Sequence, residues 1–443
     1  MAIQLSDHFT YKRLLGFVWP PIVMMIFTSI YGVVDGFFIS NYVGKIPFAA
    51  VNLIMPFLMI LGALGFMFGT GGSALVAKTL GEGNREKANQ IFSLLVYVGI
   101  ITGCILTVLG IIFLEPISIW LGAEGEMLTY CVIYGRIILI ALPAFMLQNM
   151  FQSFLVTAEK PGLGLALTLI AGVTNMILDA LFMAVFEWGT VGAAAATAIS
   201  QAVGGLVPFL YFLRPNKSLL RLTKAPFDGK ALFKTCTNGS SELVTNISMS
   251  VVSMLYNFQL LKYAGENGVA AYGVIMYVNF IFVAIFIGYS IGTAPIIGFH
   301  YGAGNDSELR SIFKKSMKLL LVAGIVLTVA GILLSRALSE LFVGYDQALC
   351  EMTVKGFRIY SITFLFCGFN IFGSSLFTAL NNGLVSAVIS FLRTLLFQVA
   401  AILVMPLIWG LDGIWYSVAV AEVVALVLTM AFIVKLRGKY HYM

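Results

Sequence analysis

Residues 42–92 read YVGKIPFAAVNLIMPFLMILGALGFMFGTGGSALVAKTLGEGNREKANQIF, and residues 263–313 are a second copy of this stretch. The second copy lies 221 positions after the first, and the register does not slip between them. The residues that recur are Tyr42, Gly44, Gly71, Gly83 and Asn84 in the first copy, and Tyr263, Gly265, Gly292, Gly304 and Asn305 in the second. The same offset relates residues 149–158 to 370–379 and residues 188–192 to 409–413. A duplicated half therefore accounts for nearly the whole chain.

The composition is that of a membrane protein. Hydrophobic residues make up 60% of the chain and charged residues 10%, and the mean hydropathy is +0.97. Soluble domains carry about 25% charged residues. The five cysteines are scattered and form no CxxC pair, so they predict neither a disulfide framework nor a zinc site.

Apolar runs of about 20 residues predict an all-α polytopic membrane protein. The first run is too long for a signal peptide and has no cleavage site, so we interpret it as a span. A β-barrel would require alternating ten-residue segments, which the sequence lacks. We expect twelve transmembrane helices at 14–40, 47–77, 88–114, 129–157, 162–186, 191–213, 236–261, 268–299, 308–334, 350–379, 384–408 and 413–435.

The basic residues predict the orientation. The turns at 41–46, 115–128, 187–190, 262–267, 335–349 and 409–412 carry only Lys45, Lys262 and Arg336, while most other Lys and Arg residues lie in the connections on the opposite side and near the two ends. By the positive-inside rule, both termini are cytoplasmic. The net charge of +6 therefore reflects topology, with membrane lipid as a partner and no nucleic acid.

The longest polar segment joins the two copies. It predicts an N-lobe at residues 1–217, a cytoplasmic linker at 218–235 and a C-lobe at 236–443. Each lobe holds six spans, and an even number means that both cross the membrane in the same direction. We expect two pseudo-symmetric six-helix bundles, as parallel repeats, around a central cleft.

The turns at 81–84 and 302–305 contain paired glycines but follow no strand and lack the third glycine of a nucleotide-binding loop. We expect the glycines to end one helix and Asn84 and Asn305 to cap the next.

Polar side chains inside the apolar runs are the candidates for function. A carboxylate at the bilayer centre costs about 2.5–3.5 kcal/mol on insertion scales. Asp35 lies in span 1, one turn after Tyr31, and Asn175 and Asp179 lie on one face of span 5. Neighbouring spans add amides and a hydroxyl at helical spacing: Asn149, Gln152, Thr197 and Gln201.

The second copy does not repeat the acids. The counterpart of Asp35 is Tyr256, and that of Asp179 is Ala400, which indicates that ion coupling belongs to the N-lobe. The C-lobe has ionisable residues of its own, whose role the sequence leaves open: Glu242, Arg393 and Glu422.

Each candidate also has a structural alternative. Asn and Thr often join membrane helices by hydrogen bonds, and a carboxylate can satisfy neighbouring amides. For Glu242, Arg393 and Glu422 we expect mainly a structural role. For the polar residues of the N-lobe spans, a structural role stays an open alternative.

These features resemble the multidrug and toxic compound extrusion (MATE) transporters over essentially the whole chain. The shared motifs are the span-1 proline followed by Tyr-Gly-x-x-Asp, the glycine-asparagine turns, and the Trp-Gly-x-x-Gly turns before spans 6 and 12. In relatives of this type an N-lobe cation site uses four positions, which are occupied here by Asp35, Asn175, Asp179 and Thr197. The helix bend of the family corresponds to Pro20. The other branch uses acids deep in the C-lobe, whereas span 10 here has Asn370 and no carboxylate at depth.

The resemblance implies an antiporter in the bacterial cytoplasmic membrane that exports organic, mostly cationic or amphiphilic compounds by alternating access. It implies no enzyme activity and no cofactor other than H⁺ or Na⁺ as the coupling ion. Two carboxylates in a poorly solvated pocket cannot both ionise at low cost, and their oxygens also suit Na⁺. We expect the substrate cavity to include Tyr31, Asn149, Gln152 and Gln201, and one chain to contain a complete pathway as a monomer.

Other classes fit less well. A lipid-linked oligosaccharide flippase would line its cleft with several basic residues, and only Arg393 lies deep in a span. An intramembrane enzyme would need a metal or nucleophile motif, and the three histidines lie near the predicted cytoplasmic ends. A symmetric channel would not confine its carboxylates to one lobe.

Overall fold

The computed structural model describes residues 3–443, and every regular element in this range is a helix. The elements in chain order are α1 (Tyr11–Phe38), η1 (Ile39–Val43), α2 (Lys45–Gly81), α3 (Arg85–Trp120), α4 (Gly125–Thr157), α5 (Pro161–Asp179), η2 (Ala180–Val185), α6 (Gly189–Leu213), α7 (Gly229–Gly302), α8 (Asp306–Val343), α9 (Gln347–Tyr360), η3 (Ser361–Thr363), α10 (Phe364–Ala379), α11 (Gly383–Phe391), η4 (Leu392–Leu396) and α12 (Phe397–Tyr440).

Within residues 3–443, ten helical segments are long and apolar enough to cross a membrane. Two of these segments each contain two spans that follow each other without a loop. The helix is interrupted between the two spans by a glycine with positive φ, Gly265 in α7 (61°) and Gly410 in α12 (57°). Gly44 and Gly189, at the equivalent places in the first copy, also have positive φ, 113° and 58°. Dividing the pairs at these glycines gives the twelve predicted spans and confirms the duplicated all-α fold.

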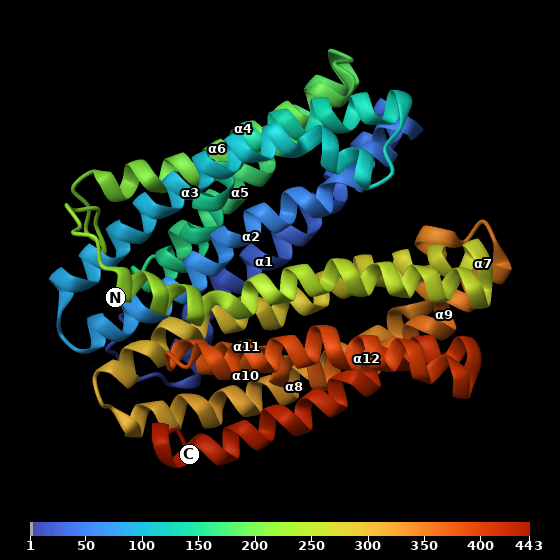
Figure 1. Ribbon diagram of the computed structural model, residues 1–443. Coiled ribbons are helices and arrows are strands. Elements are labelled where there is room, and N and C mark those ends of the chain that lie inside the picture. The colour runs from blue at the N-terminus through green and yellow to red at the C-terminus, as the bar shows by residue number, and fades with distance from the viewer. Residues whose placement is uncertain (1–2) are drawn as a thin grey trace.

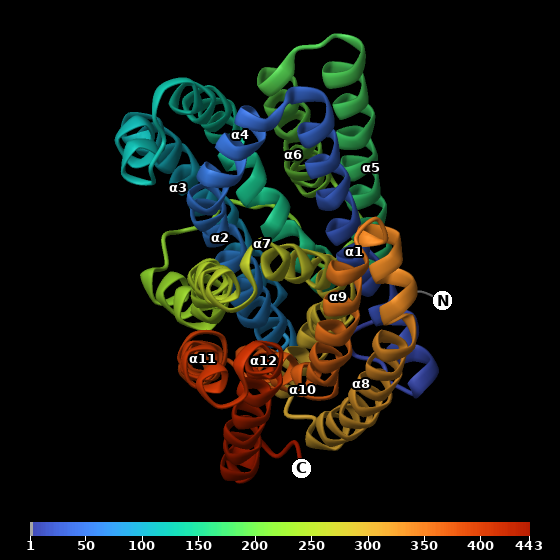
Figure 2. The ribbon, with the colours of Figure 1, turned by 90° about the vertical axis from the view of Figure 1, so that its right-hand side faces the viewer.

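The two copies form two bundles. Figure 1 shows α1–α6, coloured blue to green, as one bundle and α7–α12, coloured yellow to red, as the other. Both ends of the chain lie at the same end of the molecule, called the terminal end below. The bundles approach each other at the terminal end and diverge toward the opposite end (Figure 1). The view along the helices in Figure 2 shows α1, α2 and α7 between the outer helices of the two bundles.

Glycines allow the lobes to meet at the terminal end. A Cβ atom on Gly71 of α2 would clash with the carbonyl of Thr235 in α7, and one on Gly239 of α7 would lie 2.7 Å from the carbonyl carbon of Met67. Small residues let membrane helices approach to backbone contact. The two lobes are therefore closed against each other at this end.

Asparagines begin the helices that follow the glycine turns, as the sequence predicted. The Asn84 side chain accepts a hydrogen bond from the Lys87 amide at 3.0 Å, and Asn305 accepts one from the Glu308 amide at 3.2 Å. These bonds satisfy amide groups in the first turns of α3 and α8.

The segment between α6 and α7 is held against the N-lobe. The Arg221 amide donates to Asn89 of α3 at 2.9 Å, and the Thr223 amide donates to Ser93 at 2.8 Å. α7 then begins at Gly229, inside the predicted linker, because the Asp228 side chain caps its first turn. The division into an N-lobe, a linker and a C-lobe at the residues given above stays a prediction.

The N-terminal segment connects both lobes at the terminal end. Leu5 and Phe9 are fully buried. The Leu5 amide donates to Glu159 of the N-lobe at 2.6 Å, and the Phe9 amide donates to Glu308 of the C-lobe at 2.8 Å. The His8 ring contacts the other Glu308 oxygen at 2.6 Å. The segment therefore lies as a strap across the closed end.

Candidate functional site

Helix α1 carries Asp35 near the end that points away from the chain termini. The helix is continuous from Tyr11 to Phe38 and passes through Pro20 and Pro21 without interruption. Because each proline lacks an amide hydrogen, two intrahelical hydrogen bonds are missing in this region. The missing bonds lower the cost of a bend near Pro20. The helix is continuous at this point, and a bend at Pro20 during transport stays a prediction.

Helix α5 brings Asn175 and Asp179 into the interior. The two residues are 2% and 0% exposed. Asp179 is the last residue of α5, and the π-helical turn η2 follows it directly. Such π-turns are frequent at functional sites, because they re-aim side chains and loosen the hydrogen-bond ladder. Neither side chain has a hydrogen-bond partner among the groups that the structure describes.

The two carboxyl groups of the N-lobe lie next to each other. Asp35 and Asp179 are close enough for one to donate a hydrogen bond to the other when it is protonated. When both groups are ionised, neither can donate a hydrogen bond to the other, and their charges repel in a medium of low dielectric constant. The pair therefore suits a shared proton or a bound cation.

Two hydroxyl groups complete this arrangement. Tyr134 of α4 is fully buried, and its hydroxyl lies beside Thr197 of α6 and within electrostatic range of both carboxylates. Neither hydroxyl closes a hydrogen bond of ordinary geometry with another described residue. The sequence analysis did not include Tyr134. In the sequence, Tyr134 is one hydroxyl within an apolar span. Tyrosine is common in membrane helices, so this feature alone does not single it out.

We call Asp35, Tyr134, Asn175, Asp179 and Thr197 the N-lobe cluster. All five residues have a buried polar atom without a partner among the described residues. Leaving such an atom unpaired costs about 1–3 kcal/mol, so native proteins usually pair it with water or an ion. Carboxylate, amide and hydroxyl oxygens are ligands that Na⁺ accepts, and the carboxylates equally accept H⁺. The donor set fits H⁺ or Na⁺.

The four residues predicted for the substrate cavity divide into two pairs. Tyr31 lies within electrostatic range of Asp35, and Gln201 lies one turn from Thr197 with a buried, unpartnered Oε1 atom. This first pair adjoins the N-lobe cluster.

The second pair lies nearer the terminal end. Asn149 is about 20 Å along α4 from Tyr134, and it donates to the Gly62 carbonyl of α2 at 3.4 Å. Gln152 lines a small pocket of about 10 Å³ with Gln148 and Thr168. Asn149 thus connects α4 to α2.

The C-lobe contains a cluster of a different kind. The Arg393 Nε atom of η4 lies 2.9 Å and 3.0 Å from the two carboxylate oxygens of Glu422 in α12. Asn370 of α10 donates to the same carboxylate at 2.7 Å. The Tyr256 hydroxyl, at the position equivalent to Asp35, contacts Ser417 at 2.8 Å. Glu242 is half-buried in α7 and lies outside this cluster.

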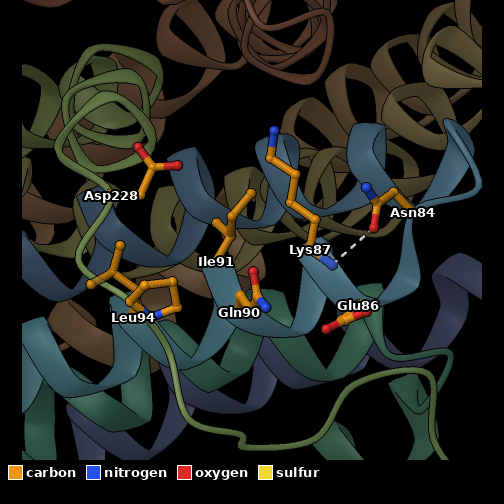
Figure 3. A pocket seen from close by; sticks show the side chains of 8 residues that line it. Asn84, Glu86, Lys87, Gln90, Ile91, Leu94 and Asp228 are labelled. Carbon is orange, nitrogen blue, oxygen red and sulfur yellow. Dashed lines mark hydrogen bonds between the residues drawn. The ribbon is translucent and has the colours of Figure 1, made fainter.

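A pocket of about 340 Å³ lies at the terminal end, remote from both clusters. Figure 3 shows Lys87 and Gln90 of α3 and Asp228 around it, with Glu86 nearby. Its wall is the first turns of α3 and the segment that precedes α7, and its lining charges have mixed sign. It contains none of the residues predicted from the sequence as site residues.

Comparisons with known proteins agree with the duplicated architecture. The MatE family model matches residues 20–181 and 243–403, one match in each copy. "Multidrug export protein MepA" of Staphylococcus saprophyticus is 25% identical over 435 residues, which cover 97% of this chain and 94% of that protein. The protein of the same name in Staphylococcus haemolyticus is also 25% identical, with the same coverage of 97% and 94%. A solved structure described as "Outward-facing conformation of a multidrug resistance MATE family transporter of the MOP superfamily" has a TM-score of 0.93 at 21% identity, and covers 100% of this chain and 99% of that chain.

Proposed function

The chain belongs to the MatE family of multidrug efflux transporters, and on that premise we propose that it is an antiporter that exports organic cations in exchange for H⁺ or Na⁺. The observation that supports this proposal most directly is the N-lobe cluster. Its two carboxyl groups adjoin each other, and Asp179 accepts no hydrogen bond from a described residue.

In this proposal the organic cation and the coupling ion are exchanged because both compete for the negative charge of the N-lobe cluster. Without a coupling ion, the negative charge of Asp35 and Asp179 attracts an organic cation to the N-lobe. A proton or Na⁺ that reaches the pair neutralises it and removes that attraction. A ligand shifts a conformational equilibrium only through its different affinity for the two states. We propose that ion binding favours a state in which α1 bends near Pro20 and the organic cation is released.

The direction of transport follows from the topology. The basic residues assign the terminal end to the cytoplasm, and the lobes are closed there by α2 and α7. In this structure the lobes diverge toward the other side (Figure 1), which the proposal assigns to the cell exterior. Asp35 lies in the half of α1 that is nearer to this side, and the proposal has the coupling ion approach it from there.

The proposed function is tested by transport of the cationic dye rhodamine 6G from proteoliposomes, driven separately by an inward H⁺ gradient and an inward Na⁺ gradient. We expect efflux with at least one ion, and a loss of about 100-fold in D35N and in D179N, because neither amide can release a proton or neutralise a cation. The matched control is D412N, which makes the same change on a C-lobe carboxylate that pairs with Lys355 at the surface. Full ion-driven efflux in both N-lobe variants would refute the proposal.

A further inference from the structure

The pocket at the terminal end has a counterpart in the other lobe that the chain itself fills. By the offset of 221, Lys87 of α3 corresponds to Glu308 of α8, and the segment before α7 corresponds to the strap before α1. Glu308 accepts a hydrogen bond from the Phe9 amide at 2.8 Å and contacts the His8 ring at 2.6 Å. In the C-lobe, the strap therefore closes this position by direct contacts.

The same position in the N-lobe is a pocket. A space of about 340 Å³ lies between Lys87 and the segment before α7. The Lys87 backbone amide donates to Asn84, but its ammonium group forms no hydrogen bond or ion pair with a described residue (Figure 3). Asp228 Oδ1 accepts from the Lys230 and Ala231 amides at 3.0 Å each, which leaves Oδ2 free to accept from a ligand. The two halves of the repeat thus differ in what meets the first turns of α3 and α8.

The lining of the pocket combines both signs of charge with an apolar wall. Lys87 and Asp228 extend to the same side of the pocket, and Ile91 lies between them (Figure 3). Ile91 and Leu94, which form the apolar wall, are buried. Glu86 adds a second carboxylate. Because opposite charges attract, a ligand that complements this lining carries an anionic group, a cationic N–H donor and an apolar part.

The pocket lies at the level of the cytoplasmic membrane surface. Lys87 directly precedes the span predicted at 88–114, and the distribution of basic residues assigns this end to the cytoplasm. Phe227, which lies between two lining residues, is 77% exposed, and Phe233 near the start of α7 is 72% exposed. Lys230 between them is exposed as well. Exposed aromatic rings and lysines near the end of a span are typical of segments that contact lipid head groups. These features favour a lipid over a soluble ligand.

We propose that this pocket binds the head group of an ethanolamine phospholipid from the cytoplasmic leaflet. The phosphate would contact Lys87, and the primary ammonium group would donate to Asp228. A choline head group has no N–H to donate, and a glycerol head group brings no positive charge to the two carboxylates. The lipid would connect α3 with the start of α7, as the strap connects the lobes elsewhere at this end. The site is separate from the N-lobe cluster, so this inference goes beyond the proposed export function.

The test compares lipids that differ only in the head group. Native mass spectrometry of the purified full chain resolves individual lipid-bound states and gives a Kd for dioleoyl phospholipids with ethanolamine, choline or glycerol head groups. We expect the ethanolamine lipid to bind about fivefold more tightly than the other two. In D228N the amide oxygen can still cap α7, so we expect the fold to persist and the preference for ethanolamine to disappear.

A second variant tests the phosphate contact. In K87Q we expect the Kd of the ethanolamine and choline lipids to rise by the same factor of about three, because both contain the phosphate. K314Q and D306N make the same two changes on exposed residues of α8, the helix equivalent to α3, and we expect neither to alter any Kd. If D228N does not elute as a folded monodisperse protein, K87Q and the labelling experiment below decide the question.

Photo-crosslinking locates the bound lipid. An ethanolamine phospholipid with a diazirine near the start of one acyl chain should label residues 84–94 or 224–233, and D228N should weaken this labelling. Labelling confined to other residues would overturn the proposal, as would equal affinity of the parent for the three lipids or an unchanged preference in D228N. Displacement of the lipid by equimolar glycerophosphoethanolamine would assign the pocket to a soluble compound instead. These measurements use no ion gradient and no exported drug, so failure of the antiporter proposal would leave their result standing.

Discussion

In the N-lobe the Asp179 carboxylate is fully buried and accepts no hydrogen bond from a described residue, whereas in the C-lobe the Glu422 carboxylate is held by Arg393 and Asn370. The two lobes share one backbone plan, including the positive-φ glycines at equivalent positions, Gly44 and Gly265. The lobes thus differ in how a buried carboxylate is neutralised.

A buried carboxylate can be neutralised in two ways, permanently by a side chain or reversibly by an ion from solution. A carboxylate whose partner is a side chain of the same fold keeps that partner through every cycle. A carboxylate without a partner among the protein groups must take a proton or cation from solution and can give it back. Under the proposed function, one lobe of the duplicated fold exchanges ions and the other carries a fixed charge. Three predictions test this comparison.

The largest effect is expected from removing one partner of the C-lobe pair. R393Q removes the counter-charge of the buried Glu422 and leaves the hydrogen bond from Asn370, so we expect a loss of about 3–5 kcal/mol in the free energy of unfolding. R393Q/E422Q removes both charges, and two amides can hydrogen-bond each other, so its stability should return to within about 1 kcal/mol of the parent. Denaturation of the purified protein in detergent measures both changes.

The same measurement on D179N sharpens the contrast. Replacing an unpartnered carboxylate by a neutral amide should leave the unfolding free energy unchanged or raise it. If D179N were as destabilising as R393Q, the Asp179 carboxylate would have a structural partner, and the distinction between the lobes would fail.

A smaller effect is expected from a matched pair of tyrosines. The Tyr134 hydroxyl of the N-lobe has no partner among the described residues, while the Tyr256 hydroxyl of the C-lobe contacts Ser417 at 2.8 Å. In Y134F we expect ion-driven efflux to fall about tenfold with stability preserved, because an oxygen is lost from the ion site. In Y256F we expect a loss of about 1 kcal/mol in stability with ion dependence preserved. A reversal of these two results would contradict the assignment of ion exchange to the N-lobe.

The fold could be predicted because its signals are long and repeated. An offset of 221 residues, apolar runs of membrane-spanning length and one-sided basic residues all specify the duplicated helical architecture. The helix caps at Asn84 and Asn305 were also predictable, because a cap depends on residues within one turn. α7 begins at Gly229, ahead of the span predicted at 236–261, because Asp228 caps it inside the segment predicted as linker.

The candidate site could be predicted only where residue type alone is informative. Asp35 and Asp179 are conspicuous because acids are costly in apolar spans. Tyr134 gave no such signal, because its importance comes from lying beside Thr197 and the acids, which depends on the rotation of α4. The pairing of Arg393 with Glu422 was likewise hidden, because the π-turn η4 sets which face Arg393 occupies.

The smallest predicted effect concerns the strap at the terminal end, where each lobe holds the N-terminal segment by one glutamate. Burial raises the pKa of Glu159 above its ordinary value, although the Leu5 amide that donates to it acts in the opposite direction. A carboxyl group whose pKa is raised in the folded protein favours the folded state at low pH. That contribution is lost as pH rises through the raised pKa.

We therefore expect the stability of the closed protein to fall by less than about 1 kcal/mol on account of Glu159, which is partly exposed, as the pH rises from below the ordinary glutamate pKa of 4.5 through the raised pKa. E159Q keeps the acceptor for the Leu5 amide and removes the titration, so its melting temperature should vary less with pH than that of the parent. E82Q is the control, because Glu82 lies at the same end, is 45% exposed, and pairs with Lys78 one turn before it. An unchanged pH dependence in E159Q would show that another group, not the N-lobe glutamate, sets the pH response of the closed end.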